Sequence, residues 1–410
     1  MKAVFAANWR LLLFGFLMMF WSSPGQTYLI SLYSGELRAS FDLTHSQFGA
    51  VYSVGTLLSA GVMVWSGRLI DRMDLAKLSL IVVCLLGAGL WWMSFSTGII
   101  ALLAGIFLLR QAGQGLMTHI GGTVMVRYFE RVKGKTTAFA WIGYVTAEAV
   151  LPILTIALIA WLGWRDAFRA SGGLLLLIMI PAILLLLRDH HRTHRRHLEE
   201  LEGHAITGDP PEVVVHWSRR DVLMDRRFYM SMPALMAAAL LFTGFFFHQI
   251  HLVESKGWSL IWWGQMFALY AASSFCATLV YGPLVDRFGA VRLLPWCILP
   301  LAAGLLLLYA SSHPAAGIAF LVLTGMTAGG VAILLGPFWA EVYGTRHLGA
   351  IKSVGTAVSV FASAVSPFAM GWLIDLGMSM ETLALLAALY IFVSAALARL
   401  AFSPPLQPRH

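Results

Sequence analysis

The sequence predicts an all-α membrane protein of twelve transmembrane helices, arranged as two pseudo-repeated six-helix bundles. The first supporting observation is composition: 59% of the 410 residues are hydrophobic and only 12% are charged, whereas about a quarter of the residues in a soluble domain are charged. The second is the length of the apolar runs, because about 20 apolar residues cross a bilayer core as a helix that satisfies its own backbone. The third is an internal repeat that relates the two halves.

Each expected helix is one apolar run bounded by polar or charged residues. The first run follows a short basic segment. It is too long for a signal peptide and lacks a small-residue cleavage site, so we expect an uncleaved span. In chain order, the expected spans are residues 9–33, 46–69, 75–96, 99–127, 135–162, 167–187, 229–254, 259–284, 291–311, 314–341, 348–374 and 378–401.

One long polar segment separates the sixth span from the seventh. We therefore expect an N-terminal six-helix bundle over 1–187, a cytoplasmic basic linker over 188–227, a C-terminal six-helix bundle over 228–402 and a cytoplasmic tail over 403–410. Most Lys and Arg residues fall in loops that share a side with the linker and both termini, so the positive-inside rule places both termini in the cytoplasm. We expect a multi-pass monomer of the cell inner membrane.

The net charge of +8 follows from this bias, and anionic lipid head groups suffice as its partner without any nucleic acid. The linker histidines invite a metal interpretation, but they lie among arginines, which favours a solvated basic stretch. We expect no metal, no cofactor and no enzyme activity, because no nucleophile–base pair or metal-ligand cluster falls within a span. The linker histidines are His190, His191, His194 and His197.

A charged loop motif occurs once in each half of the chain. GRLIDRMDLAK begins at Gly67 between spans two and three, and GPLVDRFGAVR begins at Gly282 between spans eight and nine. One register held over a long distance indicates two parallel six-helix repeats, an arrangement in which secondary transporters hold a solute between the halves. The same offset aligns distant positions, among them Tyr128 with Tyr343 and Pro152 with Pro367.

The repeated loop places a carboxylate where a helix end disfavours it. Asp71 and Asp286 are expected at cytoplasmic C-terminal helix ends, so each needs a cation or the N-terminus of span five or eleven as a partner. Such a pairing would latch the inner side and break when the halves move, which we favour over a role in loop topology alone. The expected gating residues are Gly67, Asp71, Arg72, Arg131, Gly282, Asp286, Arg287, Glu341 and Arg346.

These features together resemble the major facilitator superfamily over the whole chain. The doubled loop, with glycine, then aspartate–arginine, then a basic residue, is similar to the signature loop of that family. The twelve spans, the basic central linker and the repeated halves fit the same pattern. The resemblance implies the major facilitator fold and a secondary transporter that works by alternating access. One departure is Asp74, where the family usually has glycine, as at Gly289 in the second copy.

Within the superfamily, the sequence is loosely similar to bacterial monocarboxylate and oxalate–formate type carriers. The similarity rests on the loop over 343–351 and on the central linker. The arginine that those carriers have in span eight is absent from 259–284, and span one has no lysine. Arg110 is therefore left as the anchor for an anion.

Arg110 in span four and Glu148 in span five lie near mid-membrane, where ionisable groups are costly and are functional candidates by default. Arg110 opens a stretch that resembles the span-four arginine motif of the superfamily, although its Gln–Gly pair comes one residue later. Gln114 lies four residues after Arg110 and so on the same helix face. The guanidinium can hold a carboxylate or phosphate, or it can pair with Glu148 and lock the N-terminal half. Both interpretations stay open.

Spans seven and one supply the other candidates. His248 and His251 share a helix face, and histidine titrates near neutrality, as proton coupling requires; the alternative is a hydrogen-bonded histidine near the interface. Pro24 and the glycine after it would loosen span one and free backbone carbonyls toward a cavity, unless they only kink it. The expected substrate- and proton-binding residues are Arg110, Gln114, Glu148, His248, Gln249 and Gln26.

The leading hypothesis is a proton-coupled symporter of a small organic anion, a carboxylate, whose partners are that solute, protons and the lipid bilayer. A proton-driven exporter of amphiphilic compounds is one alternative, favoured by the 12% aromatic content. Span five, however, lacks the Gly-Pro-x-x-Gly-Gly pattern of such antiporters. A transport-inactive membrane receptor or assembly protein is the alternative of another class.

Overall fold

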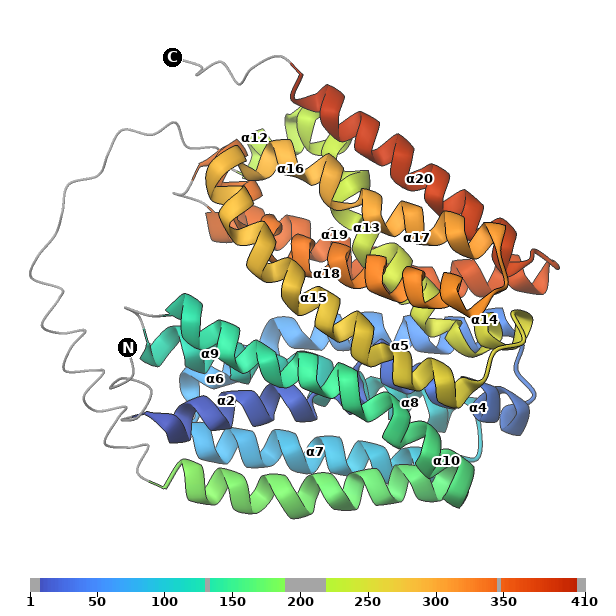
Figure 1. Ribbon diagram of the computed structural model, residues 1–410. Coiled ribbons are helices and arrows are strands. Elements are labelled where there is room, and N and C mark those ends of the chain that lie inside the picture. The colour runs from blue at the N-terminus through green and yellow to red at the C-terminus, as the bar shows by residue number, and fades with distance from the viewer. Residues whose placement is uncertain (1–7, 130–132, 189–218, 345–347, 404–410) are drawn as a thin grey trace, which may run out of the picture. The chain divides into compact units, whose positions relative to one another are not determined.

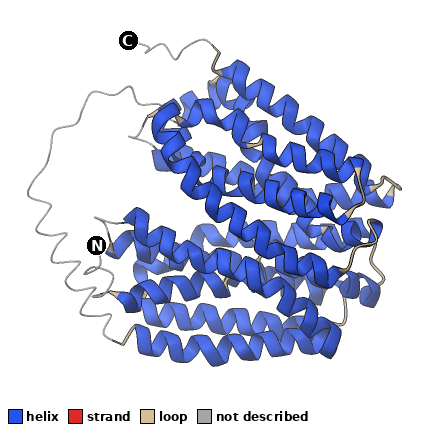
Figure 2. Cartoon of the chain, in the orientation of Figure 1, coloured by secondary structure: helices blue, strands red, loops and turns tan. Residues whose placement is uncertain are grey.

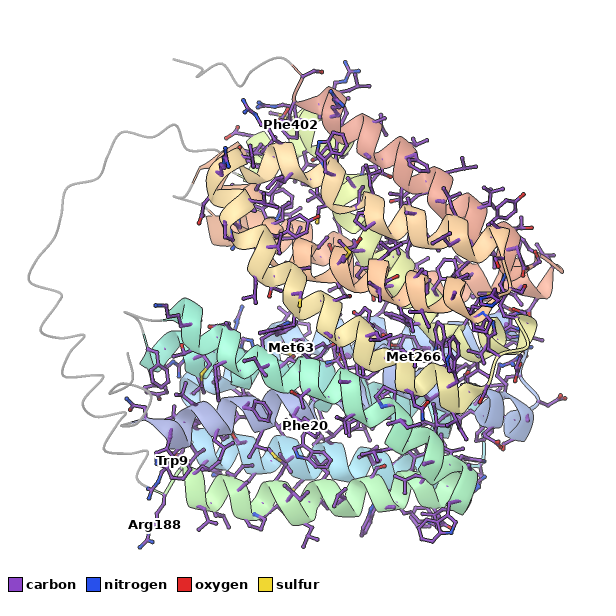
Figure 3. The ribbon with its side chains drawn as sticks, in the orientation of Figure 1. Trp9, Phe20, Met63, Arg188, Met266 and Phe402 are labelled. Carbon is purple, nitrogen blue, oxygen red and sulfur yellow. The ribbon has the colours of Figure 1, made fainter. Side chains whose placement is uncertain are left out.

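The computed structural model describes residues 8–129, 133–188, 219–344 and 348–403. These residues form helices joined by short loops, and none of them forms a strand (Figure 2). The side chains along the helices are mostly carbon, from Trp9 in the first helix to Phe402 after the last (Figure 3). Large apolar groups point outward, among them Ile100 and Trp161, which are 84% and 81% exposed. Such a surface suits lipid rather than water.

Within the described residues, ten helices are long and apolar enough to cross a membrane. The longest, Lys135–Leu186, contains a non-helical residue at Gly163 (φ 75°, ψ 163°), so it holds two spans. The first expected span, residues 9–33, is broken into short helical pieces. With these two cases resolved, the described residues give twelve spans, which confirms the predicted all-α fold.

The helices cluster into two compact units, which we describe separately. The first unit contains Met1–Tyr33 and Val54–Glu212. Its described elements, coloured blue to green in Figure 1, are α2 (Trp9–Trp21), η1 (Ser23–Gly25), α3 (Thr27–Ile30), η2 (Ser31–Tyr33), the larger part of α5 (His45–Ser66), α6 (Leu69–Arg72), α7 (Leu75–Phe95), α8 (Ile99–Leu109), η3 (Arg110–Met117), α9 (Thr118–Tyr128) and α10 (Lys133–Leu186).

The second unit contains Ser34–Ser53 and Val213–His410. Residues 34–53 were predicted to belong to the N-terminal bundle, and the linker over 188–227 lies mostly outside the described residues. The domain boundaries therefore stay a prediction. The described helices of this unit, besides the start of α5, are α4 (Ser34–Phe41), α12 (Arg219–Met224), α13 (Arg226–Phe247), α14 (Gln249–Ser255), α15 (Leu260–Phe288), α16 (Ala290–Cys297), α17 (Leu299–Ala310), α18 (Pro314–Tyr343), α19 (Leu348–Asp375) and α20 (Met380–Ala401).

The two units repeat the same helix pairings. In the first unit α10, which holds spans five and six, packs on α2 and α7, which belong to spans one and three. In the second unit α13 packs on α19 and α17 packs on α20, which pairs spans seven with eleven and nine with twelve. Glycine permits the closest of these approaches, because a Cβ at Gly143 would lie 2.2 Å from the carbonyl oxygen of Phe16. The repeat in the sequence therefore has a counterpart in packing.

Candidate functional site

Span one is interrupted in the middle of the first unit. Helix α2 ends at Trp21, the turn η1 follows, and Gln26 is extended (φ −89°, ψ 150°) before α3 resumes the helical path. Pro24 lies inside η1 and has no backbone N–H to continue the helix. The loosening predicted from Pro24 and Gly25 is thus confirmed as a full break, and Gln26 is buried within it.

Span four is irregular as well. Residues Arg110–Met117 form a π-helix, η3, between α8 and α9. A π-helical turn inside an α-helix is uncommon and is frequent at functional sites. The shared face of Arg110 and Gln114 was predicted from their spacing of four residues, and it stays a prediction. Gln114 is half-buried.

The two irregular segments cross at backbone contact distance. A Cβ added to Gly25 would lie 2.2 Å from the carbonyl oxygen of Leu109 and 2.8 Å from the Cα of Gly113. These neighbours are backbone atoms that cannot rotate away. The break in span one can lie against the π-helix of span four because each segment has a glycine at the crossing.

The side chain of Arg110 is held at this crossing. It is 1% exposed, and its Nη1 donates to the carbonyl oxygen of Gly25 at 3.1 Å and to Oγ1 of Thr27 at 3.5 Å. A guanidinium in a membrane helix is costly unless polar groups surround it. The broken backbone of span one supplies such groups, as a continuous helix would not.

Glu148 lies close to Tyr28, which belongs to the same stretch of span one. Its side chain is 6% exposed, hydrogen-bonded with Tyr144 and close enough to Tyr28 to act on it electrostatically. The rings of Tyr28 and Tyr144 meet edge to face at 6.4 Å. Within residues 25–28, Gly25 and Thr27 accept from Arg110, and Tyr28 lies close to Glu148. The direct pairing of Arg110 with Glu148 stays a prediction.

Gln111, which was not among the predicted site residues, joins spans two and four. Its Oε1 accepts from Ser59 Oγ at 3.1 Å and its Nε2 donates to Ser66 Oγ at 2.8 Å. Gln111 is 4% exposed, so these bonds satisfy an amide that would otherwise be buried without partners. Its place directly after Arg110 was the one available signal, but i+4 spacing directed attention to Gln114 instead.

In the second unit, His248 and Gln249 are both buried but serve different contacts. Nε2 of His248 donates to the carbonyl oxygen of Pro367 at 2.9 Å, and Oε1 of Gln249 accepts from Nε1 of Trp263 at 2.8 Å. His251 faces the same space as His248, as the sequence predicts. The structure adds His45, whose ring centroid lies 4.6 Å from that of His251. Sequence reasoning missed His45, because nothing local relates it to span seven.

The gating residues are described only in part. The side chain of Asp71 and the residues Arg131 and Arg346 fall outside what the structure describes, so the latch stays a prediction. Around the first loop, Nε2 of His119 donates to the carbonyl oxygen of Gly67 at 3.1 Å, and Nη1 of Arg127 donates to that of Ile70 at 3.0 Å.

The two copies of the loop start their next helix in different ways. Asp74 caps α7 by accepting from the backbone N–H of Lys77 at 3.0 Å. In the second copy Gly289 has φ 80°, and Oε2 of Glu341 accepts from the N–H of Ala290 at 2.7 Å. A carboxylate thus stabilises a helix N-terminus in both copies. This accounts for aspartate at position 74, where the second copy has glycine.

The linker histidines His190, His191, His194 and His197 lie outside the described residues. Among the residues that are described, no group of three or more His, Cys, Asp and Glu side chains is placed to hold a metal ion.

Comparison with known proteins assigns the family. The model of the Major Facilitator Superfamily matches residues 11–280 and 249–410. The chain is similar in structure to a bacterial homolog of the human lysosomal transporter Spinster in an inward-facing and occupied conformation, with a TM-score of 0.66 at 15% identity over 99% of this chain and 98% of that one. It is also similar to the nucleoside transporter NupG, with a TM-score of 0.70 at 13% identity over 97% of this chain and 99% of that one. The chain belongs to the major facilitator superfamily and is a membrane transporter rather than an enzyme.

Proposed function

We propose that this transporter is a proton-coupled symporter of a small organic anion that works by alternating access. The supporting observation is the buried guanidinium of Arg110, which donates to the broken backbone of span one. Ionisable groups inside a membrane mark solute and ion paths more often than packing. Broken helices are also where transporters of this type build their sites.

A carboxylate can replace the present acceptors of Arg110. Its two oxygens match the planar fork of a guanidinium, and it brings a full negative charge where Gly25 and Thr27 offer neutral oxygens. The exchange would release the carbonyl of Gly25, so binding of the solute acts directly on the turn that interrupts span one. A solute can shift a conformational equilibrium only through such a difference in contacts.

Glu148 supplies the proton site in this proposal. Its buried carboxyl group adjoins Tyr28, which follows the Gly25–Thr27 stretch that contacts Arg110. When Glu148 carries a proton, it no longer competes as an anion for the guanidinium of Arg110. The solute carboxylate then binds best together with the proton, which is the thermodynamic requirement for symport.

An open hollow of about 620 Å³ lies in the first unit directly after the π-helix. We propose that this hollow is the cytoplasmic approach to Arg110, and that the linker and both termini lie on the same side of the membrane. The loops that contain Asp71 and Asp286 would form the latch on that side. The working form would be a monomer in the inner membrane. Three threonine hydroxyls and one guanidinium offer a charged solute polar contacts along this approach. The hollow is lined by Thr118, His119, Gly122, Thr123, Val126, Arg127 and Thr137.

An aromatic cluster in the second unit favours a second candidate, an exporter of amphiphilic compounds. The ring of Phe246 lies 5.5 Å from that of Phe267 and 5.3 Å from that of Tyr270, and Trp263 adjoins Phe267 at 6.1 Å. Flat apolar cations bind well to such rings. Efflux of ethidium from membrane vesicles under a proton gradient would support this candidate and contradict the symporter.

A thermal-shift screen followed by uptake tests the proposal. Purified protein is screened against small carboxylic acids, sugars, amino acids and drugs at two pH values, and each hit is assayed for uptake into proteoliposomes. We expect stabilisation by carboxylic acids alone, lost in Arg110→Gln and retained in the matched control Arg165→Gln, whose guanidinium also donates to backbone carbonyls. Anion binding that survives Arg110→Gln overturns the assignment of the site, and binding without uptake indicates a receptor.

A further inference from the structure

Helix α5 belongs to both compact units. Residues Ser34–Ser53, which include α4 and the start of α5, cluster with the second unit, whereas Val54 and the rest of α5 cluster with the first. A single helix therefore has one end held by each unit. Any movement of the units requires that end to be released or the helix to bend.

Backbone and aromatic contacts hold the start of α5 on the second unit. The carboxylate of Asp375, at the end of α19, accepts from the N–H groups of His45 at 3.1 Å and Ser46 at 2.8 Å and so caps α5. The ring of Phe48 stacks on that of Phe247 at 5.1 Å. A Cβ on Gly49 would lie 2.5 Å from the carbonyl oxygen of Pro367, which shows how closely α5 approaches α19.

Three histidines meet at the centre of this contact. His45 of α5 lies 4.6 Å from His251 and 5.7 Å from His248, measured between ring centroids, and the rings enclose a small cavity with Ser34, Arg38 and two phenylalanines. His248 is 3% exposed, whereas His45 and His251 are half-buried and open to protons from solvent.

The charges around the histidines come from every element packed against them. Arg38 of α4 acts on all three rings, Glu254 of α14 acts on Arg38 and His251, and Asp375 of α19 acts on Arg38, His45 and His251. Glu381 of α20 acts on His251 and is itself paired with Lys256 at 2.8 Å. While the histidines are neutral, the positive charge of Arg38 is balanced by the carboxylates of Glu254 and Asp375.

We propose that His45, His248 and His251 form a proton-sensitive clasp, whose protonation loosens residues 34–53 from α13, α14 and α19. Each proton added to one of the three imidazoles places a positive charge close to the guanidinium of Arg38. It also places that charge close to the N-terminus of α5, which is itself partly positive. The imidazoles of His45 and His251 pack edge to face while neutral, and they repel each other when both are charged. Acid pH thus frees the start of α5 to move with the remainder of its helix.

The clasp does not depend on which solute is carried, and its test needs no transport. Spin labels are placed on the exposed positions 39 and 255 by Ala39→Cys and Ser255→Cys, in a background where Cys84, Cys276 and Cys297 are replaced by alanine. The distance distribution is measured by pulsed EPR in nanodiscs at pH 8 and pH 5. We expect one short distance at pH 8 and, at pH 5, a longer population at least threefold larger than at pH 8.

The double variant His45→Gln/His251→Gln tests the cause, because both side chains are half-buried and the buried His248 is left in place. We expect it to show the pH 8 distribution at both pH values. The matched control is His313→Asn, an exposed histidine that caps α18 through its side chain, and it should keep the full pH response. An unchanged distribution in the parent protein, or a pH response that persists in the double variant, overturns the clasp.

Discussion

Replacing Gly25 with alanine tests whether the crossing of spans one and four is as tight as the structure shows. The new Cβ would lie 2.2 Å from the carbonyl oxygen of Leu109, whereas ordinary contact begins at 3.4 Å, so the two backbones must separate by about 1.2 Å. Overpacking of this kind costs about 1–3 kcal/mol. The same separation breaks the charged hydrogen bond from Arg110 to Gly25, which contributes about 1.5–3 kcal/mol.

Together these terms predict that Gly25→Ala loses about 2.5–6 kcal/mol of stability, which for a unit of this size lowers the Tm by roughly 5–24 °C. The assay is thermal unfolding followed by tryptophan fluorescence in detergent. Gly61→Ala is the matched control, because a Cβ there has no neighbour within 4 Å and alanine gains up to about 1 kcal/mol in a helix. A Gly25→Ala protein as stable as Gly61→Ala would refute the close crossing.

Three further predictions address charges and one glycine. Glu148→Gln should abolish accumulation driven by external acid while solute exchange at equal concentrations persists, because the neutral amide mimics the protonated carboxyl; the measurement is flux in proteoliposomes. Glu381→Gln should cost about 1–3 kcal/mol in thermal unfolding, since the buried ammonium of Lys256 loses its counterion at 2.8 Å. Gly289→Ala should cost about 1–2 kcal/mol in the same assay, because φ is 80° there and the new Cβ would meet Glu341 Oε1 at 2.7 Å.

The two stability predictions each have a contrasting variant. Glu36→Gln removes an exposed carboxylate on α4 and should change stability by less than about 0.5 kcal/mol. Gly173→Ala adds a Cβ into open space and should not destabilise α10. Acid-driven accumulation that survives Glu148→Gln would remove that carboxyl from the coupling step. Equal unfolding temperatures for Glu381→Gln and Glu36→Gln would show that the Lys256 pair contributes nothing.

The fold could be predicted because the sequence patterns that a lipid bilayer imposes extend over many residues. Apolar runs of about 20 residues, the polar segment after span six and the repeated loop each report on many residues at once. The failures were local. Pro24 predicted a loosened helix but not a full break. The π-helix at Arg110 and its close crossing with Gly25 are not revealed by any spacing in span four.

The candidate site could be predicted only where ionisable side chains, which are rare inside a membrane, fall within a span. Arg110 and Glu148 stand out in any apolar sequence, and the structure places both beside residues 25–28. His45 could not be found, because its partners His248 and His251 are brought to it by the association of residues 34–53 with the second unit. Gln249 was selected for its polarity, and its side chain accepts a hydrogen bond from Nε1 of Trp263.

Proton movement during solute uptake tests the central claim most directly, namely that solute and proton act on the same break in span one. Proteoliposomes that enclose a pH-sensitive dye receive the carboxylate identified by the thermal-shift screen, and internal acidification is recorded together with solute uptake. We predict that the two signals rise together in the parent protein, and that both are lost in Arg110→Gln while only the acidification is lost in Glu148→Gln. Solute uptake without acidification in the parent protein, or acidification that continues in Glu148→Gln, would contradict the account.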